Sequence, residues 1–329
     1  MRRILMAVAT LALVVLASTA AFAQHGTRNI TVAVQATGTV KWELAAMQAL
    51  GIHKKHNLVI DVREVADSKA GQIALQAKEA DIILSDFVWV ALQRHEGNLV
   101  SFVSHSLTVG GLMVDPAAGI ATIADLKGKT LAVSGSPVDK SFVILSAEYN
   151  KLTGGNLTDD ADVKFGAPPL VNELLTTGQA QAALNLWNWN SRAKLAGKTE
   201  LVSVPDLLKD LGVTETPPLL GWAFFEDNAK AKKADFKAFF DASFETKKAL
   251  LEDDAVWDQI RPEMNVGDDD ALFTQLRDDY RKGIVTKYAA TAMDPAKESF
   301  ALMAKFGGKD VVGDITEIPD GTFYKSYRK

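Results

Sequence analysis

The segment DLKGKTLAV, residues 125–133, carries the clearest structural signal in this chain. A polar turn containing Gly128 leads directly into residues 130–133, a short apolar run of the kind that forms buried strands. The same arrangement recurs along the chain, where short apolar runs alternate with stretches whose apolar residues have helical spacing. Such alternation predicts an α/β fold.

Strands are predicted where the short apolar runs lie, at residues 30–34, 58–62, 81–84, 100–103, 112–114, 130–133, 163–165, 180–186 and 219–225. Helices are predicted at residues 41–50, 70–78, 87–93, 141–151, 170–177, 234–251, 254–260, 268–282 and 295–305. A chain of 329 residues exceeds what one compact core usually supports, so two lobes are expected.

The N-terminus has the pattern of a cleaved secretory signal. Arg2 and Arg3 precede an apolar run over residues 4–16, and residues 21–23, Ala-Phe-Ala, supply small residues at both positions of a cleavage site. The apolar run is shorter than the roughly 18–20 residues that a spanning helix needs. We therefore expect a signal peptide over residues 1–23, cleavage near Ala23 and a periplasmic mature chain.

The composition argues against several classes of function. The formal net charge is −5 and there is no basic stripe, which disfavours nucleic-acid binding. The chain has no cysteine, which excludes disulfides, thiolate metal sites, cysteine nucleophiles and a lipid anchor on cysteine.

Two motifs that suggest other chemistry are weak. His53 and His56 have metal-like spacing but no third ligand close to them in the sequence. Residues 127–130, Lys-Gly-Lys-Thr, lack the first glycine of a phosphate-binding loop, because Ile123 stands at that position. We expect no metal, no cofactor and no catalytic residue.

Three segments together resemble one protein family. Residues 51–62, GIHKKHNLVIDV, look like its passage from a helix end into the second strand. Residues 78–82, KEADI, resemble its turn before the third strand, and residues 125–133 resemble the start of its second lobe. The family is the nitrate/sulfonate/taurine-type substrate-binding proteins of ABC importers, with their thiamine-pyrimidine-precursor relatives.

The resemblance implies a type II periplasmic-binding fold, in which two α/β lobes are joined by two crossing strands. Residues 28–113 and 223–329 would form lobe 1, and residues 114–222 would form lobe 2. The resemblance also implies a monomer that holds a small polar or anionic molecule in the cleft between the lobes and delivers it to an inner-membrane ABC permease. An enzyme on the same fold, similar to a pyrimidine-precursor synthase, and a periplasmic ligand sensor or accessory protein are the alternatives.

Polar loops that follow the predicted strands are the candidate binding sites, because ligands of open α/β sheets bind at the carboxyl ends of the strands. The polar candidates are Thr37, Gly38, Thr39, Asp67, Ser68, Ser85, Asp86, His105, Ser134, Gly135, Ser136, Asn185 and Asn188. For several of these residues, helix capping is the alternative role.

Aromatic side chains near the same loops would supply flat walls for the ligand. The aromatic candidates are Trp42, Phe87, Trp187, Trp189 and Trp222, with core packing as the alternative for each. Because Trp187 and Trp189 are separated by one residue, both cannot easily face one core.

The charge of the ligand is left open by the sequence. Four basic side chains near the loops would be the partners of an anion: Lys41, Lys69, Lys140 and Arg192. The family commonly has an Asp-Ala pair before the aromatic loop, whereas this chain has Gln181 and Ala182. An anion such as a sulfonate and a heteroaromatic molecule stacked on tryptophan are therefore both compatible with the sequence.

Overall fold

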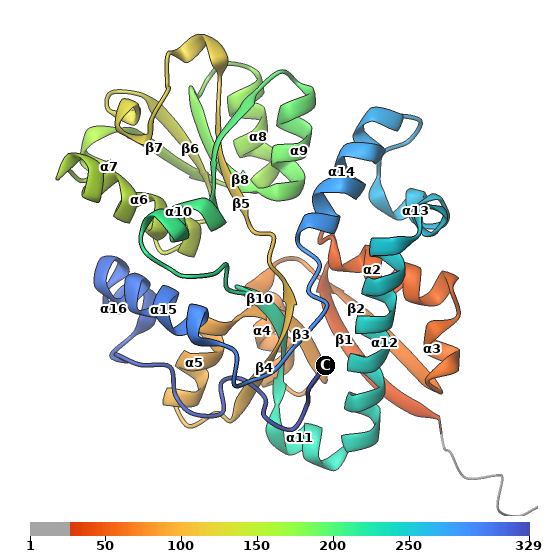
Figure 1. Cartoon of the computed structure of the whole chain (residues 1–329). Coiled ribbons are helices and arrows are strands. Elements are labelled where there is room, and N and C mark those ends of the chain that lie inside the picture. The colour runs from red at the N-terminus through yellow and green to blue at the C-terminus, as the bar shows by residue number, and fades with distance from the viewer. Residues whose placement is uncertain (1–26) are drawn as a thin grey trace, which may run out of the picture.

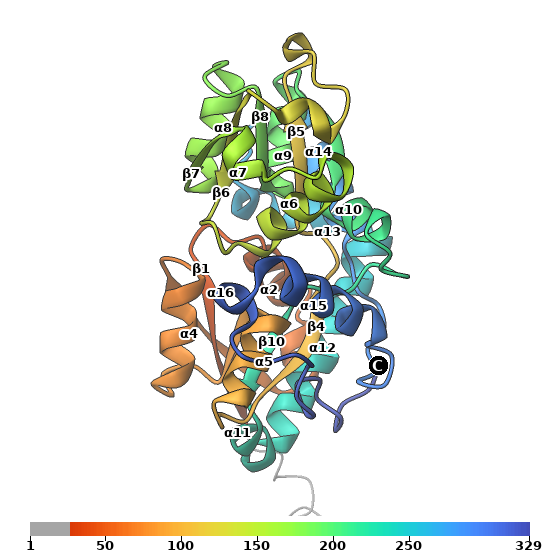
Figure 2. The same cartoon turned by 90° about the vertical axis from the view of Figure 1, so that its left-hand side faces the viewer.

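The structure is a computed structural model that describes residues 27–329, so the predicted signal peptide lies outside the described residues. The described chain forms two five-stranded sheets with helices on both sides of each. The two lobes built on these sheets stand one above the other (Figure 1 and Figure 2). The α/β prediction is confirmed.

The first sheet, in lobe 1, has the strand order β2-β1-β3-β10-β4. Its strands are β1 (Arg28–Gln35), β2 (Leu58–Val65), β3 (Ile82–Asp86), β4 (Val100–Ser106) and β10 (Leu220–Phe225). Its helices are α2 (Val40–Ala49), α3 (Ile52–Lys55), α4 (Ser68–Gln76), α5 (Phe87–His95), α11 (Glu226–Ala231) and α12 (Lys233–Glu252). β1 runs parallel to β2 and β3, so the loops that follow β1 and β3 leave the same edge of the sheet.

The second sheet, in lobe 2, has the order β7-β6-β8-β5-β9. Its strands are β5 (Gly110–Val114), β6 (Thr130–Ser134), β7 (Asp162–Gly166), β8 (Ala182–Leu186) and β9 (Thr199–Ser203). Two short 3-10 turns, η2 (Pro116–Ala118) and η3 (Ile123–Leu126), precede β6, and the helices are α6 (Lys140–Thr153), α7 (Leu157–Asp160), α8 (Pro168–Thr176), α9 (Trp187–Leu195) and α10 (Val204–Asp210). β6 runs parallel to β7 and β8, so the loops after β6 and β8 also share one edge.

The C-terminal part of the chain contacts both lobes. It contains α13 (Asp254–Ile260), the turn η4 (Arg261–Met264), α14 (Asp270–Lys282), α15 (Asp294–Gly307) and α16 (Lys309–Val312). α14 packs against α9 and α15 packs against α6, both of which belong to lobe 2. This segment therefore bridges the lobes in addition to the two crossings of the chain.

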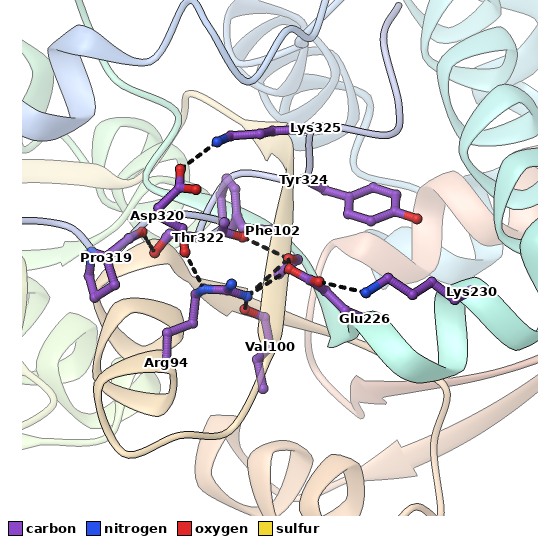
Figure 3. A network of polar contacts seen from close by, with 12 residues as sticks. Arg94, Val100, Phe102, Glu226, Lys230, Pro319, Asp320, Thr322, Tyr324 and Lys325 are labelled. Carbon is purple, nitrogen blue, oxygen red and sulfur yellow. Dashed lines mark hydrogen bonds and ion pairs between the residues drawn. The ribbon is translucent and has the colours of Figure 1, made fainter.

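A polar network fixes the chain end on lobe 1 (Figure 3). The backbone N–H of Phe102 donates to the carbonyl of Thr322 at 2.8 Å, which lays the C-terminal segment beside β4. Arg94 of α5 donates to the carboxylate of Glu226 and to the carbonyl of Asp320, each at 2.8 Å. Because Arg94 and Glu226 are largely buried, this pair is screened from water and resists salt better than a surface pair.

The crossings between the lobes lie a few residues away from their predicted places. β5 belongs to the second sheet and β10 to the first, so the chain crosses at 107–109 and again at 211–219. The boundaries predicted after residue 113 and after residue 222 are corrected accordingly. The sequence analysis also missed β9 and α10, because β9 is a half-buried edge strand too short to show a clear alternation. Among residues 27–329, no helix combines the length and apolarity required to cross a membrane.

Candidate functional site

The loops after β1, β2, β3, β6 and β8 face the junction between the lobes (Figure 1). We call this junction the interlobe face, and it is formed by residues 36–39, 67–68, 86, 134–140 and 186–187. An ion pair crosses it, since Lys140 Nζ of α6 lies 3.2 Å from Asp86 Oδ2 at the end of β3. The carboxylate of Asp86 raises the pKa of Lys140, which keeps the lysine protonated at neutral pH. Loops that are distant in sequence are thereby brought opposite each other.

Three aspartates at the interlobe face cap helices. Asp67, Asp86 and Asp139 each accept a hydrogen bond from a backbone N–H in the first turn of the following helix, at 2.8, 2.8 and 2.9 Å. Asp67 and Asp86 thus take the capping role that was the alternative to ligand contact. Asp86 uses one carboxylate oxygen as the cap and the other for Lys140.

The remaining polar loops keep exposed surface. Residues 37–39 precede α2, and residues 134–136 precede the α6 cap; all are exposed or half-exposed. α2 and α9 both begin without a side-chain cap hydrogen bond. The first turn of α2 contains the carboxylate of Glu43, whereas the first turn of α9 contains no acidic residue, so the positive dipole end of α9 is not neutralised within the helix. Two further predicted residues bond within lobe 1: Ser68 Oγ accepts from Gln35 at 2.7 Å, and the buried Ser85 accepts from Gln72 at 3.3 Å.

Two aromatic predictions are wrong. The side chains of Phe87 and Trp222 are fully buried in the core of lobe 1, where they present no surface to a ligand. Trp222 Nε1 donates to Ser243 Oγ at 3.2 Å, which satisfies the indole inside the core. Both residues stand at or next to predicted strands, and the sequence did not show that their rings point into the core of lobe 1.

Two of the predicted tryptophans meet at the lobe junction. Trp42 of lobe 1 and Trp187 of lobe 2 lie with ring centroids 5.8 Å apart at a right angle, and Tyr280 of α14 contacts both rings. Trp42 is buried, and its Nε1 donates to the carbonyl of Glu263 at 3.0 Å, whereas Trp187 is half-buried. Trp189 is also half-buried, under the guanidinium of Arg192 at 5.2 Å.

The two predicted asparagines differ in surroundings. Asn185 is buried, and its amide donates to the carbonyl of Pro168 at 2.9 Å while its oxygen accepts from Leu186 N at 2.9 Å. It therefore ties the end of β8 to the first turn of α8. Asn188 is half-buried on α9, and its backbone carbonyl accepts a hydrogen bond from the guanidinium of Arg192.

His105 is buried inside lobe 1, in a cluster that the sequence analysis missed. Its Nε2 lies 3.0 Å from Glu43 Oε2, and Lys247 Nζ lies 3.2 Å from the same oxygen. Ser243 Oγ donates to Glu43 Oε1 at 2.5 Å. All of these side chains are buried. The sequence contains a pattern that could have indicated this cluster. Glu43 and Lys247 stand on the apolar faces of their helices, where a charged side chain needs a buried partner.

The electrostatics of this cluster follow from burial and pairing. Burial by itself would raise the pKa of Glu43, but the charge of Lys247 and contacts with His105 and Ser243 lower that pKa to about 2. Burial and then the charge of Lys247 lower the pKa of His105, so the imidazole is neutral at neutral pH. The cluster is thus a buried Glu43–Lys247 ion pair beside a neutral histidine.

Two hollows lie close to the crossings. A cavity of ≈ 10 Å³, about the room of one water molecule, is lined by His105, Lys247, Tyr280 and the segment 283–284. A larger pocket of ≈ 280 Å³, which we call the hinge pocket, is lined by residues 107–110 and Thr216 of the two crossings and by parts of α9, β9 and α14. No group of three or more His, Cys, Asp or Glu side chains within residues 27–329 is placed to hold a metal ion.

Two five-stranded α/β lobes joined by two crossings define a type II periplasmic-binding fold. The chain belongs to the NMT1/THI5 like family, which it matches over residues 43–254. The resemblance seen in the sequence is confirmed. No curated protein sequence matches the chain.

Solved structures of this fold include binding proteins and an enzyme. The alkanesulfonate-binding protein SsuA from Xanthomonas axonopodis pv. citri, bound to MOPS, is 15% identical with a TM-score of 0.69, over 91% of this chain and 98% of that chain. The periplasmic aliphatic sulphonate binding protein SsuA from Escherichia coli is 15% identical with a TM-score of 0.68, over 88% and 97%. The desulfurization enzyme DSZB is 13% identical with a TM-score of 0.59, over 90% and 97%.

Proposed function

We propose that this protein is the periplasmic substrate-binding component of an ABC importer, which captures a small polar or anionic organic molecule at the interlobe face. The observation that carries the proposal is the Asp86–Lys140 pair, which places a protonated lysine of one lobe against the strand ends of the other. A ligand anion can replace Asp86 as the partner of Lys140, and the same exchange would couple ligand capture to a change in lobe position.

The surrounding residues support an acidic ligand group. The first turn of α9 has neither a side-chain cap nor an acidic residue, so its N–H groups and dipole end favour an anion, while Lys140 supplies a full charge. Leu186, at the end of β8, is 40% exposed and offers apolar surface to the body of the molecule. A small organic acid with an apolar part fits this combination better than an inorganic ion.

The test is calorimetric titration of the mature protein with a panel of short alkanesulfonates, alkanoates and heteroaromatic acids. We expect at least one to bind, and Lys140→Gln to weaken it about tenfold to a hundredfold, since a hydrogen bond to a charged group is lost. Lys248→Gln is the matched control, because Lys248 is exposed and its ion-pair partner, Glu252, lies on the same helix α12. Equal affinities of both variants would refute the site.

An enzyme is the second candidate, because DSZB shares the fold. The two functions differ in what happens to the bound molecule. Recovery of the ligand from the complex with its mass unchanged after prolonged incubation supports a binding protein. Conversion of the ligand at a catalytic rate supports the enzyme, which would have to work without a cysteine because the chain has none.

A further inference from the structure

The hinge pocket shares Trp187 with the interlobe face and otherwise lies outside it. It is bounded by residues 107–109 of the first crossing, by Gly110 of β5 and by Thr216 of the second crossing, and no residue of the loops after β1, β3 or β6 lines it. Its ≈ 280 Å³ is close to the size of natural small-molecule sites. The half-buried ring of Trp187 supplies an apolar wall.

Four charged side chains line the hinge pocket as two ion pairs. Lys194 Nζ of α9 lies 2.5 Å from Glu200 Oε2 of β9. Lys282 Nζ lies 2.6 Å from Asp279 Oδ1, both on α14. The two ion pairs interact electrostatically. After stronger local effects, the charge of Lys194 contributes to the lowered pKa of Asp279, and the charge of Glu200 contributes to the raised pKa of Lys282.

This quartet has no net charge, yet it offers a cation and an anion on each of two walls. A ligand with a single charge meets one attractive and one repulsive partner on either wall. A small zwitterion meets an attractive partner for both of its charges, its ammonium group between the carboxylates and its acidic group between the lysines. The wall of Trp187 also favours a cationic group over its face.

The hinge pocket joins parts of the chain that belong to different lobes. Trp187 and Lys194 are on α9 and Glu200 is on β9, all in lobe 2, while Asp279 and Lys282 are on α14 of the C-terminal segment. An occupant would therefore contact lobe 2, α14 and both crossings at once. Its binding energy would depend on how the lobes are placed.

We propose that the hinge pocket is a second ligand site, which takes a small zwitterion carrying an ammonium and an acidic group, and that its occupant stabilises the present arrangement of the lobes. Apart from Trp187, its lining residues differ from those of the interlobe face. Binding to the folded protein alone multiplies the folding equilibrium constant by about elevenfold at a tenfold excess of ligand over Kd. For a protein of this size, that corresponds to a rise in Tm of about 3 °C.

The experiment is a thermal-shift series on the mature protein with glycine, β-alanine and γ-aminobutyrate, followed by calorimetry. Propylamine and propionate serve as singly charged controls. The pocket is blocked by Thr216→Trp, which adds a bulky ring to an exposed lining residue. Glu215→Trp is the matched control, because Glu215 is the exposed neighbour that does not line the pocket.

We expect at least one zwitterion to raise Tm by about 3 °C in the native protein and in Glu215→Trp, and to have no effect on Thr216→Trp. Glu200→Gln, which removes one charge without filling the pocket, should weaken the same zwitterion about tenfold. Lys140→Gln should change its affinity less than Glu200→Gln does, because Lys140 does not line the pocket.

Several results would overturn the proposal. These are no shift with any of the zwitterions, equal shifts with the singly charged controls, and a shift that survives in both Thr216→Trp and Glu200→Gln. A shift that disappears in Lys140→Gln would assign the zwitterion to the interlobe face and equally reject the hinge pocket.

Discussion

Replacement of Glu43 by glutamine should destabilise the protein strongly, because it leaves Lys247 as a buried charge without a counterion. Removing one member of a buried ion pair costs about 3–5 kcal/mol. The pKa of Glu43 gives a second estimate: a decrease from 4.5 to about 2 in the folded state corresponds to ~3 kcal/mol of stability at neutral pH. The carboxylate is fully buried, so no discount for solvent screening applies.

The sign of the pH dependence follows from the lowered pKa. The contribution of Glu43 is complete above pH 4.5, and it is lost as the pH falls toward 2, where the folded protein must take up the proton. The Glu43→Gln variant should therefore lose less stability than the native protein over that range of pH.

Urea unfolding at pH 7, followed by circular dichroism, measures the free energies. Asp294→Asn is the control, since Asp294 forms an exposed pair with Lys297 and its loss should change stability by less than about 1 kcal/mol. The double variant Glu43→Gln/Lys247→Met should recover part of the loss, because the unpaired charge is removed as well. If Glu43→Gln costs no more than the control, or the double variant is no more stable than the single one, the buried pair does not have the energetics argued here.

Two further outcomes are expected. Gly110→Ala should destabilise the protein by ~2 kcal/mol or more in urea unfolding, because the added Cβ would lie 2.0 Å from the carbonyl oxygen of Asn185. Gly71→Ala is the control and should be close to neutral, because the nearest atom to its added Cβ lies at 3.8 Å. Equal effects of the two substitutions would contradict the close approach of β5 and β8. Because burial lowers the pKa of His105, the free energy of unfolding of the native protein should decrease as the pH falls below 6.5. His105→Asn should reduce the slope of the unfolding free energy against pH between pH 7 and 5. An unchanged slope would show that His105 is not the titrating group.

The sequence predicted the regular elements well because each is a local pattern. The predicted strands at residues 130–133 and 180–186 overlap β6 and β8, and both are largely buried strands identified by their apolar composition. The lobe boundaries could not be read in this way. Residues 110–114 look the same whichever sheet they join, and only pairing with β8 and β9 assigns them to lobe 2.

The candidate site was predicted less completely, since it depends on the directions of side chains. The loops were proposed because they follow strands, and the pairing of Lys140 with a ligand anion stays a prediction, since the structure pairs Lys140 with Asp86. Nothing local distinguishes Trp222, which turns into the core, from Trp187, which reaches the lobe junction. The Glu43–Lys247 pair joins residues about 200 positions apart, a contact that only the packing of α2 against α12 creates.

α9 connects the two sites proposed for this protein. At its N-terminus, Trp187 packs against Trp42 of lobe 1, and one turn later Ser191 donates to Asp279 of α14 at 2.7 Å. A rotation of lobe 2 relative to lobe 1 must therefore move α9 against α2, or carry α14 along with it. Either movement changes both the interlobe face, where α9 begins, and the hinge pocket, which α9 and α14 line. Binding at the two places is then linked, and linkage is reciprocal: if a zwitterion in the hinge pocket alters the affinity for the ligand at the interlobe face, that ligand must alter the affinity for the zwitterion by the same factor.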